Sequence, residues 1–224
     1  MSVVIPALDE EAGIEGAIRS ARDVLGGCEI VVADGGSRDR TVALAVEAGA
    51  RVVEARGTRA DGMNAGATAT GGTVLLFLHA DTTLPGDAGD VIELALRDAV
   101  GGAFSLGFDD RPRLARFAAA LYRPFHRGVY GDQAIFVTRE TWDRVGGYRQ
   151  LPIMEDFDFV QRVRKVGRFV VLPETVTTSA RRQRVHGEVR TFATVASIKV
   201  LYRLGVSPTR LARAYRQRAY RQLG

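Results

Sequence analysis

Residues 2–34 read SVVIPALDEEAGIEGAIRSARDVLGGCEIVVAD, in which two apolar runs flank one helical pattern. The runs at residues 2–7 and 29–33 do not alternate with polar residues, as expected of strands that are buried on both faces. Between them, residues 10–25 repeat apolar side chains at helical spacing. The stretch therefore predicts two parallel strands joined by a helix.

The alternation of strand and helix continues along the chain. Strands are expected at residues 50–55, 74–78, 103–108, 134–137 and 168–172, and Pro173 is expected to end the last of them. Helices are expected at residues 38–48, 59–69, 87–96, 114–125, 138–145, 155–166, 189–204 and 208–222. The predicted fold class is α/β, with a Rossmann-like, mostly parallel sheet, helices on both faces and C-terminal amphipathic helices. Residues 1–174 are expected to form the main domain, on which residues 175–224 pack as a basic helical appendage.

The composition excludes several protein classes. The chain has 224 residues, is 46% hydrophobic and 25% charged, and is long enough to bury a core without disulfides. Its single cysteine, Cys28, rules out an internal disulfide framework. No apolar run reaches the ~18 residues of a membrane-spanning helix, and no basic segment precedes the first apolar run, as it would in an export signal. The expectation is a cytoplasmic enzyme.

The net charge of +5 is unevenly distributed. Residues 175–224 contain eleven basic side chains and one acid, Glu188, so the remainder of the chain is mildly acidic. Such a tail forms either a solvated helix face or an anion-binding surface. As a hypothesis, its arginines contact an acidic membrane near a lipid-like acceptor, beside Leu201, Leu204 and Leu211. The same helices could instead form a homodimer interface, and nucleic acid is disfavoured because the tail lacks interleaved aromatic residues.

Acidic residues follow several of the expected strands. Residues 9–11 follow the first strand, Asp34 the second and Asp81 the most apolar one, while Glu155 and Asp156 open a later helix. Because ligands bind outside the carboxyl ends of parallel strands, these acids indicate a cation, a sugar or a base edge as the ligand.

Helix capping is the alternative explanation for any one of these acids. It predicts that Asp9 and Ser37 cap the helices that follow them, but it does not explain Asp81. The chain has neither a G-x-G-x-x-G loop nor a G-x-x-x-x-G-K-[ST] loop, so a bound diphosphate would need a divalent ion or an arginine. Asp81 offers an oxygen ligand to Mg²⁺ or Mn²⁺, and Arg59 begins a helix from which it can reach a phosphate.

Six motifs occur in a fixed order along the chain. They are VVIPALDEE (3–11), VVADGGSRDRT (31–41), RADGMNAGA (59–67), LFLHADTTLP (76–85), GGY (146–148) and MEDFDF (154–159). Together they resemble glycosyltransferase family 2, with the GT-A fold, and most of all the small bacterial branch with LDEE, DGGS, HAD and GDQ motifs. The resemblance covers roughly residues 2–173. It implies an inverting enzyme that moves a sugar from a nucleotide diphosphate sugar, with a UDP-sugar favoured, to an acceptor hydroxyl.

The resemblance also implies where donor and acceptor bind. The nucleoside would be lined by Pro6, Leu8 and Glu10, with Asp34 on the base, and the nucleotide or its phosphates would be faced by Arg59 and Asn64. The donor sugar and the acceptor would approach Asp132 and Gln133.

The resemblance further implies a metal ligand and a catalytic base. Asp81 matches the last acid of the D-x-D motif, which helps to hold Mn²⁺ or Mg²⁺ and the diphosphate. Asp156 matches the general base that takes the proton of the acceptor hydroxyl, and Glu155 beside it could raise its pKa by like-charge repulsion.

Two histidines mark departures from the family pattern. His79 stands where the first acid of D-x-D is usual, and His186 follows a segment that only partly matches Q-x-x-R-W; both are further candidate metal ligands. Two alternative functions are compared with the sequence pattern: a nucleotidyltransferase and a non-catalytic binding module. A sugar-1-phosphate nucleotidyltransferase would need a glycine-rich basic loop where residues 7–11 are acidic, and a non-catalytic nucleotide-sugar-binding module finds its support in His79.

Overall fold

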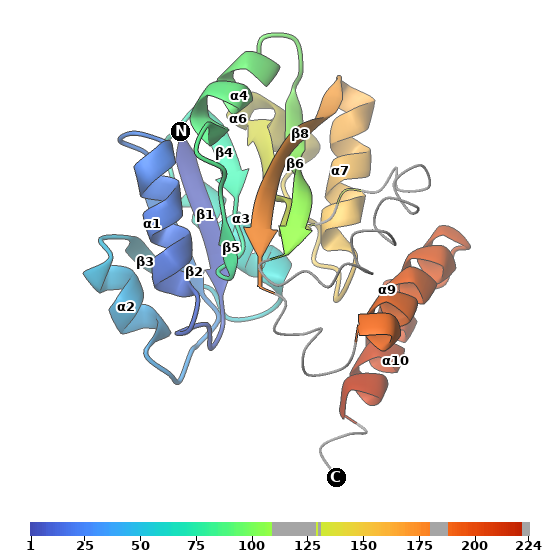
Figure 1. Ribbon diagram of the computed structural model, residues 1–224. Helices are drawn as coiled ribbons and strands as arrows, with labels where there is room; N and C mark the ends of the chain where they lie inside the picture. The colour runs from blue at the N-terminus through green and yellow to red at the C-terminus, as the bar shows by residue number, and fades with distance from the viewer. Residues whose placement is uncertain (109–128, 130, 180–187, 221–224) are drawn as a thin grey trace.

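A computed structural model describes residues 1–108, 129, 131–179 and 188–220 (Figure 1). The helix expected at residues 114–125 and the candidate ligand His186 lie outside the described residues. Within them, eight strands form one sheet in the order β3-β2-β1-β4-β7-β6-β8-β5.

The first half of the chain alternates strand and helix as predicted. Its elements are β1 (Ser2–Ala7), α1 (Ile14–Val24), β2 (Glu29–Asp34), α2 (Thr41–Glu47), β3 (Arg51–Glu54), α3 (Arg59–Thr68) and β4 (Val74–Phe77). Strand β1 pairs in parallel with β2 and β4, and β2 pairs in parallel with β3. The carboxyl ends of these four strands therefore lie at one edge of the sheet.

The second half adds strands of both directions. Its elements are β5 (Thr82–Thr83), α4 (Ala88–Ala95), β6 (Gly101–Phe108), the 3₁₀ turn η2 (Gly131–Gln133), β7 (Ile135–Thr138), α6 (Arg139–Val145), α7 (Glu155–Val166), β8 (Phe169–Thr178), α9 (Glu188–Arg203) and α10 (Pro208–Tyr220). Strand β7 runs antiparallel to β4 and β6, β8 runs parallel to β6, and β5 pairs antiparallel with β8. The predicted α/β class, with parallel pairings in the majority, is confirmed.

The last strand is longer than predicted, because Pro173 does not end it. Strand β8 continues to Thr178 and pairs with β6 on both sides of the proline. The register shifts between Ala103 and Ser105, and the Ser105 hydroxyl donates to the Leu172 carbonyl oxygen at 2.8 Å. Such an irregularity accommodates a residue that has no backbone N–H to give to the ladder. The boundary expected after residue 174 consequently falls inside β8.

The loops after β1 and β2 bind each other, and the capping prediction for Asp9 and Ser37 is wrong. The Arg38 N–H donates to Asp9 Oδ1 at 2.8 Å, and the Asp9 N–H donates to Ser37 Oγ at 3.0 Å. Helices α1 and α2 begin only at Ile14 and Thr41, several residues after the predicted starts. The physical reason is that β1 and β2 are neighbours, so these polar groups meet across the two loops before either helix begins.

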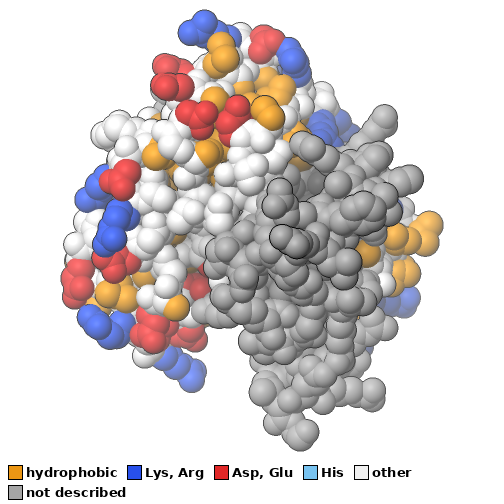
Figure 2. All heavy atoms as spheres, viewed as in Figure 1, with side chains coloured by type: hydrophobic (Ala, Val, Ile, Leu, Met, Phe, Trp, Pro, Cys, Tyr) orange, Lys and Arg blue, Asp and Glu red, His pale blue; other side chains and the backbone are white. Residues whose placement is uncertain are grey.

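Helices cover both faces of the sheet (Figure 1). Along β1, Val3 and Ile5 belong to the cluster that includes side chains of α1, α2 and α4, whereas Val4 belongs to the cluster with side chains of α3 and α7. Adjacent residues of a strand point to opposite faces, so a continuous apolar run is required here. Charged side chains of both signs are interspersed over the α1 and α2 side of the molecule (Figure 2).

Helices α9 and α10 pack against each other and against the start of α7. In α10, Leu211 and Ala212 are buried and Arg210 and Arg213 are exposed, as predicted for an amphipathic helix. In α9, Ile198 is buried, whereas Val200 and Leu201 are exposed, so described apolar side chains of this helix lie both toward the protein and toward solvent. None of the described helices is both long enough and apolar enough to cross a bilayer.

Candidate active site

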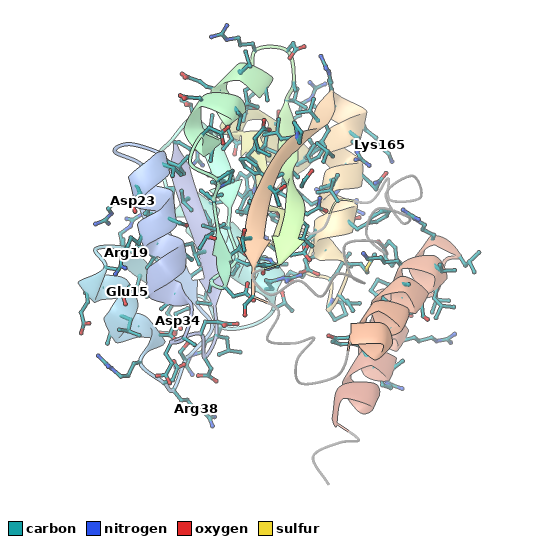
Figure 3. All side chains as sticks on the ribbon, in the orientation of Figure 1. Glu15, Arg19, Asp23, Asp34, Arg38 and Lys165 are labelled. Carbon is teal, nitrogen blue, oxygen red and sulfur yellow. The ribbon has the colours of Figure 1, made fainter. Side chains whose placement is uncertain are left out.

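The loop that follows β2 is organised by Asp34, which lies at the lower end of the sheet in Figure 3. Asp34 Oδ2 accepts the N–H groups of Gly36 at 3.0 Å and Ser37 at 3.1 Å, and Oδ1 accepts the Ser37 hydroxyl at 2.5 Å. Gly36 has φ +99°, a conformation that favours glycine. Asp34, which is predicted to contact the nucleobase, therefore also stabilises the turn that follows β2.

The other residues expected around a nucleoside lie at the neighbouring strand end. Pro6 is the half-buried penultimate residue of β1, and Leu8, directly after the strand, is 57% exposed. The Glu10 N–H donates to Thr41 Oγ1 at 2.8 Å, which holds this loop against the start of α2. An exposed leucine at this position offers an apolar contact to a ligand.

An ion-pair cluster joins α3 to α7. Arg59, the first residue of α3, donates from Nε to Glu155 Oε1 at 2.7 Å and from Nη2 to Asp156 Oδ2 at 2.8 Å. Its Nη1 lies 3.4 Å from Nε2 of His79 at the end of β4. Thr58 and Asp61 form a capping box at the start of α3, which fixes where Arg59 begins the helix. The cluster thus unites predicted residues that are almost a hundred positions apart in the sequence.

Asp156 is the most perturbed acid of this cluster. Burial raises its pKa, the Arg59 charge opposes that rise, and Glu155 and Asp132 add to it, so that the pKa of Asp156 reaches about 7. The attraction of Asp156 and Glu155 outweighs desolvation at Arg59 and raises the pKa of its guanidinium. Asp156 Oδ1 is buried and has no hydrogen-bond partner among the residues that the structure describes. A buried acceptor without a donor is rare in proteins and calls for an explanation such as a catalytic role or a bound water or ion.

The turn η2 closes over this carboxylate. The Gly131 N–H donates to Asp156, and a Cβ atom at position 131 would lie 2.5 Å from Asp156 Oδ2 and 2.8 Å from His79 Nε2. Only glycine fits such an approach. Asp132, the next residue of η2, acts electrostatically on both Asp156 and Arg59. The side chain of Gln133 instead donates to the Phe104 carbonyl oxygen at 3.0 Å.

Asn64 lies farther along α3 and binds the chain before α7. Its Nδ2 donates to the Tyr148 carbonyl oxygen and its Oδ1 accepts the Tyr148 N–H, both at 2.8 Å. The Tyr148 ring is buried and stacks on Phe159 of α7 at 4.1 Å between ring centroids. Asn64 was expected to face a nucleotide, and in this structure its amide joins α3 to the GGY turn.

Asp81 follows β4 and is held by the last strand. Its Oδ1 accepts the hydroxyl of Thr178 at 3.2 Å and that of Thr82 at 3.3 Å, and its carbonyl oxygen accepts the Ser179 N–H at 3.1 Å. The described residues contain no group of three or more His, Cys, Asp or Glu side chains that could hold a metal ion. Asp81, with His79 two residues before it, can supply only part of a coordination shell.

Three residues near this cluster are not among the predicted site residues: Gly131, Tyr148 and Lys199. Gly131 and Tyr148 belong to the GDQ and GGY motifs, which are the sequence signal for these two positions. Lys199 lies on α9, where Asp132 acts on it electrostatically. No local pattern distinguishes this lysine from the arginines of the basic tail.

The sheet has the fold of the GT-A glycosyltransferases. The family model described as glycosyl transferase family 2 matches residues 2–149, and the chain belongs to this family. A PGL/p-HBAD biosynthesis glycosyltransferase of Mycobacterium tuberculosis is 32% identical over 186 residues, which cover 70% of this chain and 67% of the relative. The predicted family and the predicted enzyme class are confirmed.

Two solved structures show the same fold. Glucosyl-3-phosphoglycerate synthase from Mycobacterium tuberculosis, in complex with Mn²⁺, UDP and glucosyl-3-phosphoglycerate, is 25% identical with a TM-score of 0.54, over 78% of this chain and 69% of that chain. TarS 1-349 of S. aureus, in complex with UDP-GlcNAc, is 14% identical with a TM-score of 0.64, over 80% of this chain and 58% of that chain. The TarS likeness concerns the fold alone.

Proposed function

We propose that this glycosyltransferase inverts the anomeric centre as it moves a sugar from a UDP-sugar to an acceptor hydroxyl, with Asp156 as the general base. The observation that carries the proposal is the state of Asp156: buried, with a pKa near 7, and with Oδ1 lacking a partner among the described residues. A base works best when its pKa lies near the operating pH. The Asp156 carboxylate at the start of α7 meets that condition.

The proposed reaction needs one carboxylate. The acceptor oxygen forms a bond to the anomeric carbon while its proton passes to Asp156 Oδ1, and the bond between the sugar and the diphosphate breaks on the opposite face. Gly131 and Arg59 both donate to the Asp156 carboxylate, which leaves Oδ1 as the oxygen for the acceptor. Glu155 holds Arg59 in this position.

Arg59 would also bind the donor diphosphate. Its side chain is 44% exposed, while the carboxylates that it pairs with are only 4% exposed, so it faces both the interior and the open side of the site. A guanidinium presents its donors in a planar fork that suits two anions at once. The nucleoside would lie along Pro6, Leu8 and Glu10 beside the Asp34 turn, and the complex of the similar synthase with UDP supports a uridine nucleotide.

A divalent cation fits the chemistry of Asp81 and His79 if it arrives with the nucleotide. One carboxylate and one imidazole suit Mn²⁺, and the diphosphate oxygens of the donor would supply further ligands. Structures of the similar synthase with Mn²⁺ and UDP support this assignment. When bound, the cation would stabilise the negative charge of the departing diphosphate.

The role of Asp81 has a direct calorimetric test. In the presence of Mn²⁺, Asp81→Ala should weaken UDP binding by roughly tenfold or more, because a directly bound ligand should matter at least as much as an outer-shell partner. Without Mn²⁺ the affinity should change little. Asp90→Ala, an exposed acid on α4, is the matched control and should bind UDP like the wild type. Equal affinities of wild type and Asp81→Ala under both conditions would count against Asp81 as a ligand.

The stereochemistry tests the whole proposal. With UDP-glucose, Mn²⁺ and water as acceptor, the first sugar product should be β-glucose, because inversion converts the α-linked donor. Proton NMR taken before mutarotation distinguishes the two anomers. Initial release of α-glucose would exclude inversion. Absence of turnover with any of a panel of nucleotide sugars would favour the non-catalytic alternative, and the nucleotidyltransferase alternative would instead require release of a sugar phosphate.

The acceptor remains at the level of prediction. Val200 and Leu201 are exposed on α9, and Arg203 and Arg210 lie near them in the chain, which suits either a lipid-like acceptor at an acidic membrane or a homodimer interface. These two uses of the C-terminal helices, first considered from the sequence, stay predictions.

A further inference from the structure

The first turn of α7 carries the proposed base but begins in an unusual way. Met154, its N-cap residue, has φ 68° and ψ 18°, in the left-handed region that a residue with a side chain rarely adopts. Its side chain makes no capping hydrogen bond within the described residues. Such a conformation persists only where surrounding structure enforces it. The position of Glu155 and Asp156 therefore depends on what surrounds Met154.

The C-terminal helices supply those surroundings. Met154 forms a buried cluster with Ile198 of α9 and Leu211 of α10, and the latter side chain is only 3% exposed. This cluster is separate from the two clusters that hold helices to the sheet.

A second set of contacts lies just after the base. The Phe157 ring meets Tyr202 of α9 edge to face at 5.7 Å, and the Arg203 guanidinium lies over the same ring at 5.5 Å from its centroid. Aromatic and cation–π contacts of this kind prefer defined geometries. Met154 and Phe157, the residues on either side of the Glu155–Asp156 pair, are thus both packed against the C-terminal helices.

An electrostatic interaction reaches the other side of the site. Lys199 follows Ile198 on α9, and Asp132 of η2 acts electrostatically on it and on Asp156 alike. Burial lowers the pKa of Lys199 to about 8, while the attraction of Asp132 opposes that fall. Helix α9 therefore neighbours both segments, η2 and the start of α7, between which the base lies.

We propose that α9 and α10 are a positioning element for the active site: through Ile198 and Leu211 they fix Met154 and with it the Asp156 carboxylate. The inference rests on the proposed function of Asp156. None of these three apolar residues touches the reacting atoms, so their effect should appear in the chemical step and not in donor binding. Small displacements of a catalytic group reduce rates strongly, by about 10²-fold for 1 Å.

The test compares two leucines of the C-terminal region. Leu211→Ala should lower kcat for transfer of glucose from UDP-glucose to water by roughly ten- to a hundredfold, with KM and the calorimetric affinity for UDP changed less than about twofold. Leu204→Ala removes a side chain that is 75% exposed and should match the wild type in both. Leu211→Met, which keeps an apolar side chain of similar volume, should restore most of the rate.

Two further measurements keep the outcomes distinct. UDP binding stoichiometry reports the folded fraction, and Ile198→Val, a milder change in the same cluster, replaces Leu211→Ala if that variant does not fold. Amide hydrogen exchange at residues 154–158 should quicken in Leu211→Ala and not in Leu204→Ala. The positioning role would be overturned if Leu211→Ala, or folded Ile198→Val in its place, had the kcat of the wild type and the same exchange rate at residues 154–158. A wild-type protein that binds UDP but turns over no nucleotide sugar would instead remove the proposed function, and exchange would still show whether the helices fix α7.

Discussion

Asp156→Asn should lower the rate of sugar transfer by ~10²–10⁴-fold, the range typical for loss of a general base. The amide has nearly the same shape as the carboxylate but accepts no proton from an alcohol. UDP affinity in the presence of Mn²⁺ should stay within about twofold of the wild type, because in the proposed arrangement Asp156 faces the acceptor and not the nucleotide. Transfer rates from NMR or UDP release and affinities from calorimetry measure the two quantities separately.

Asp158→Asn is the matched control for this substitution. Asp158 lies on the same first turn of α7, but it pairs with Arg149 and Arg162 on the side away from the cluster. Removal of its charge should change the transfer rate far less than removal of the Asp156 charge. Full transfer activity in Asp156→Asn would reject this residue as the base, even if the rest of the assignment held.

The rate should rise with pH through about 7, and Arg59→Gln should move that rise to higher pH. Asp156 accepts a proton only when ionised, so kcat falls as the pH drops below the pKa of about 7. Arg59 lowers the pKa of Asp156, because a positive charge favours the carboxylate. Loss of this charge should raise the pKa by about one unit or more, and the variant should therefore be most impaired at and below neutral pH.

The pH profile of kcat at saturating donor separates this effect from weaker binding. Arg59→Gln should also raise KM for the UDP-sugar, since the same guanidinium is proposed to bind the diphosphate. Arg149→Gln removes an exposed arginine that pairs with Asp158 and should leave both the profile and KM unchanged. If kcat decreased over the same pH range in Arg59→Gln and in the wild type, Arg59 would not control the ionisation of the base.

The first half of the fold could be predicted because each of its signals is local. An apolar run such as residues 74–78 or a helical pattern such as residues 59–69 determines its own element, and the βαβ order then fixes parallel pairing. Strand β8 could not be predicted in full, since Pro173 is a strand breaker by its own chemistry. Its place in the sheet depends on an irregular register with β6, which no short stretch of sequence specifies.

The site was predictable as a set of residues but not as a set of contacts. The motifs pointed to Arg59, Glu155 and Asp156, yet spacing along the chain does not reveal that one guanidinium binds both carboxylates. The contact of Asn64 could not be predicted either. Its side chain binds the backbone of Tyr148, and a motif specifies side chains but not backbone contacts. Long-range packing decides these contacts, and it also brings Lys199 to Asp132.

The hydroxyl of Thr178 and the amide of Ser179 both bind Asp81, and this has a practical consequence for fragment design. A recombinant fragment that stops at residue 174 would lack the strand partner of β5 and would expose a carboxylate whose neighbours had been cut away. A shortened version made for crystallography or for nucleotide titrations has to extend at least through Ser179.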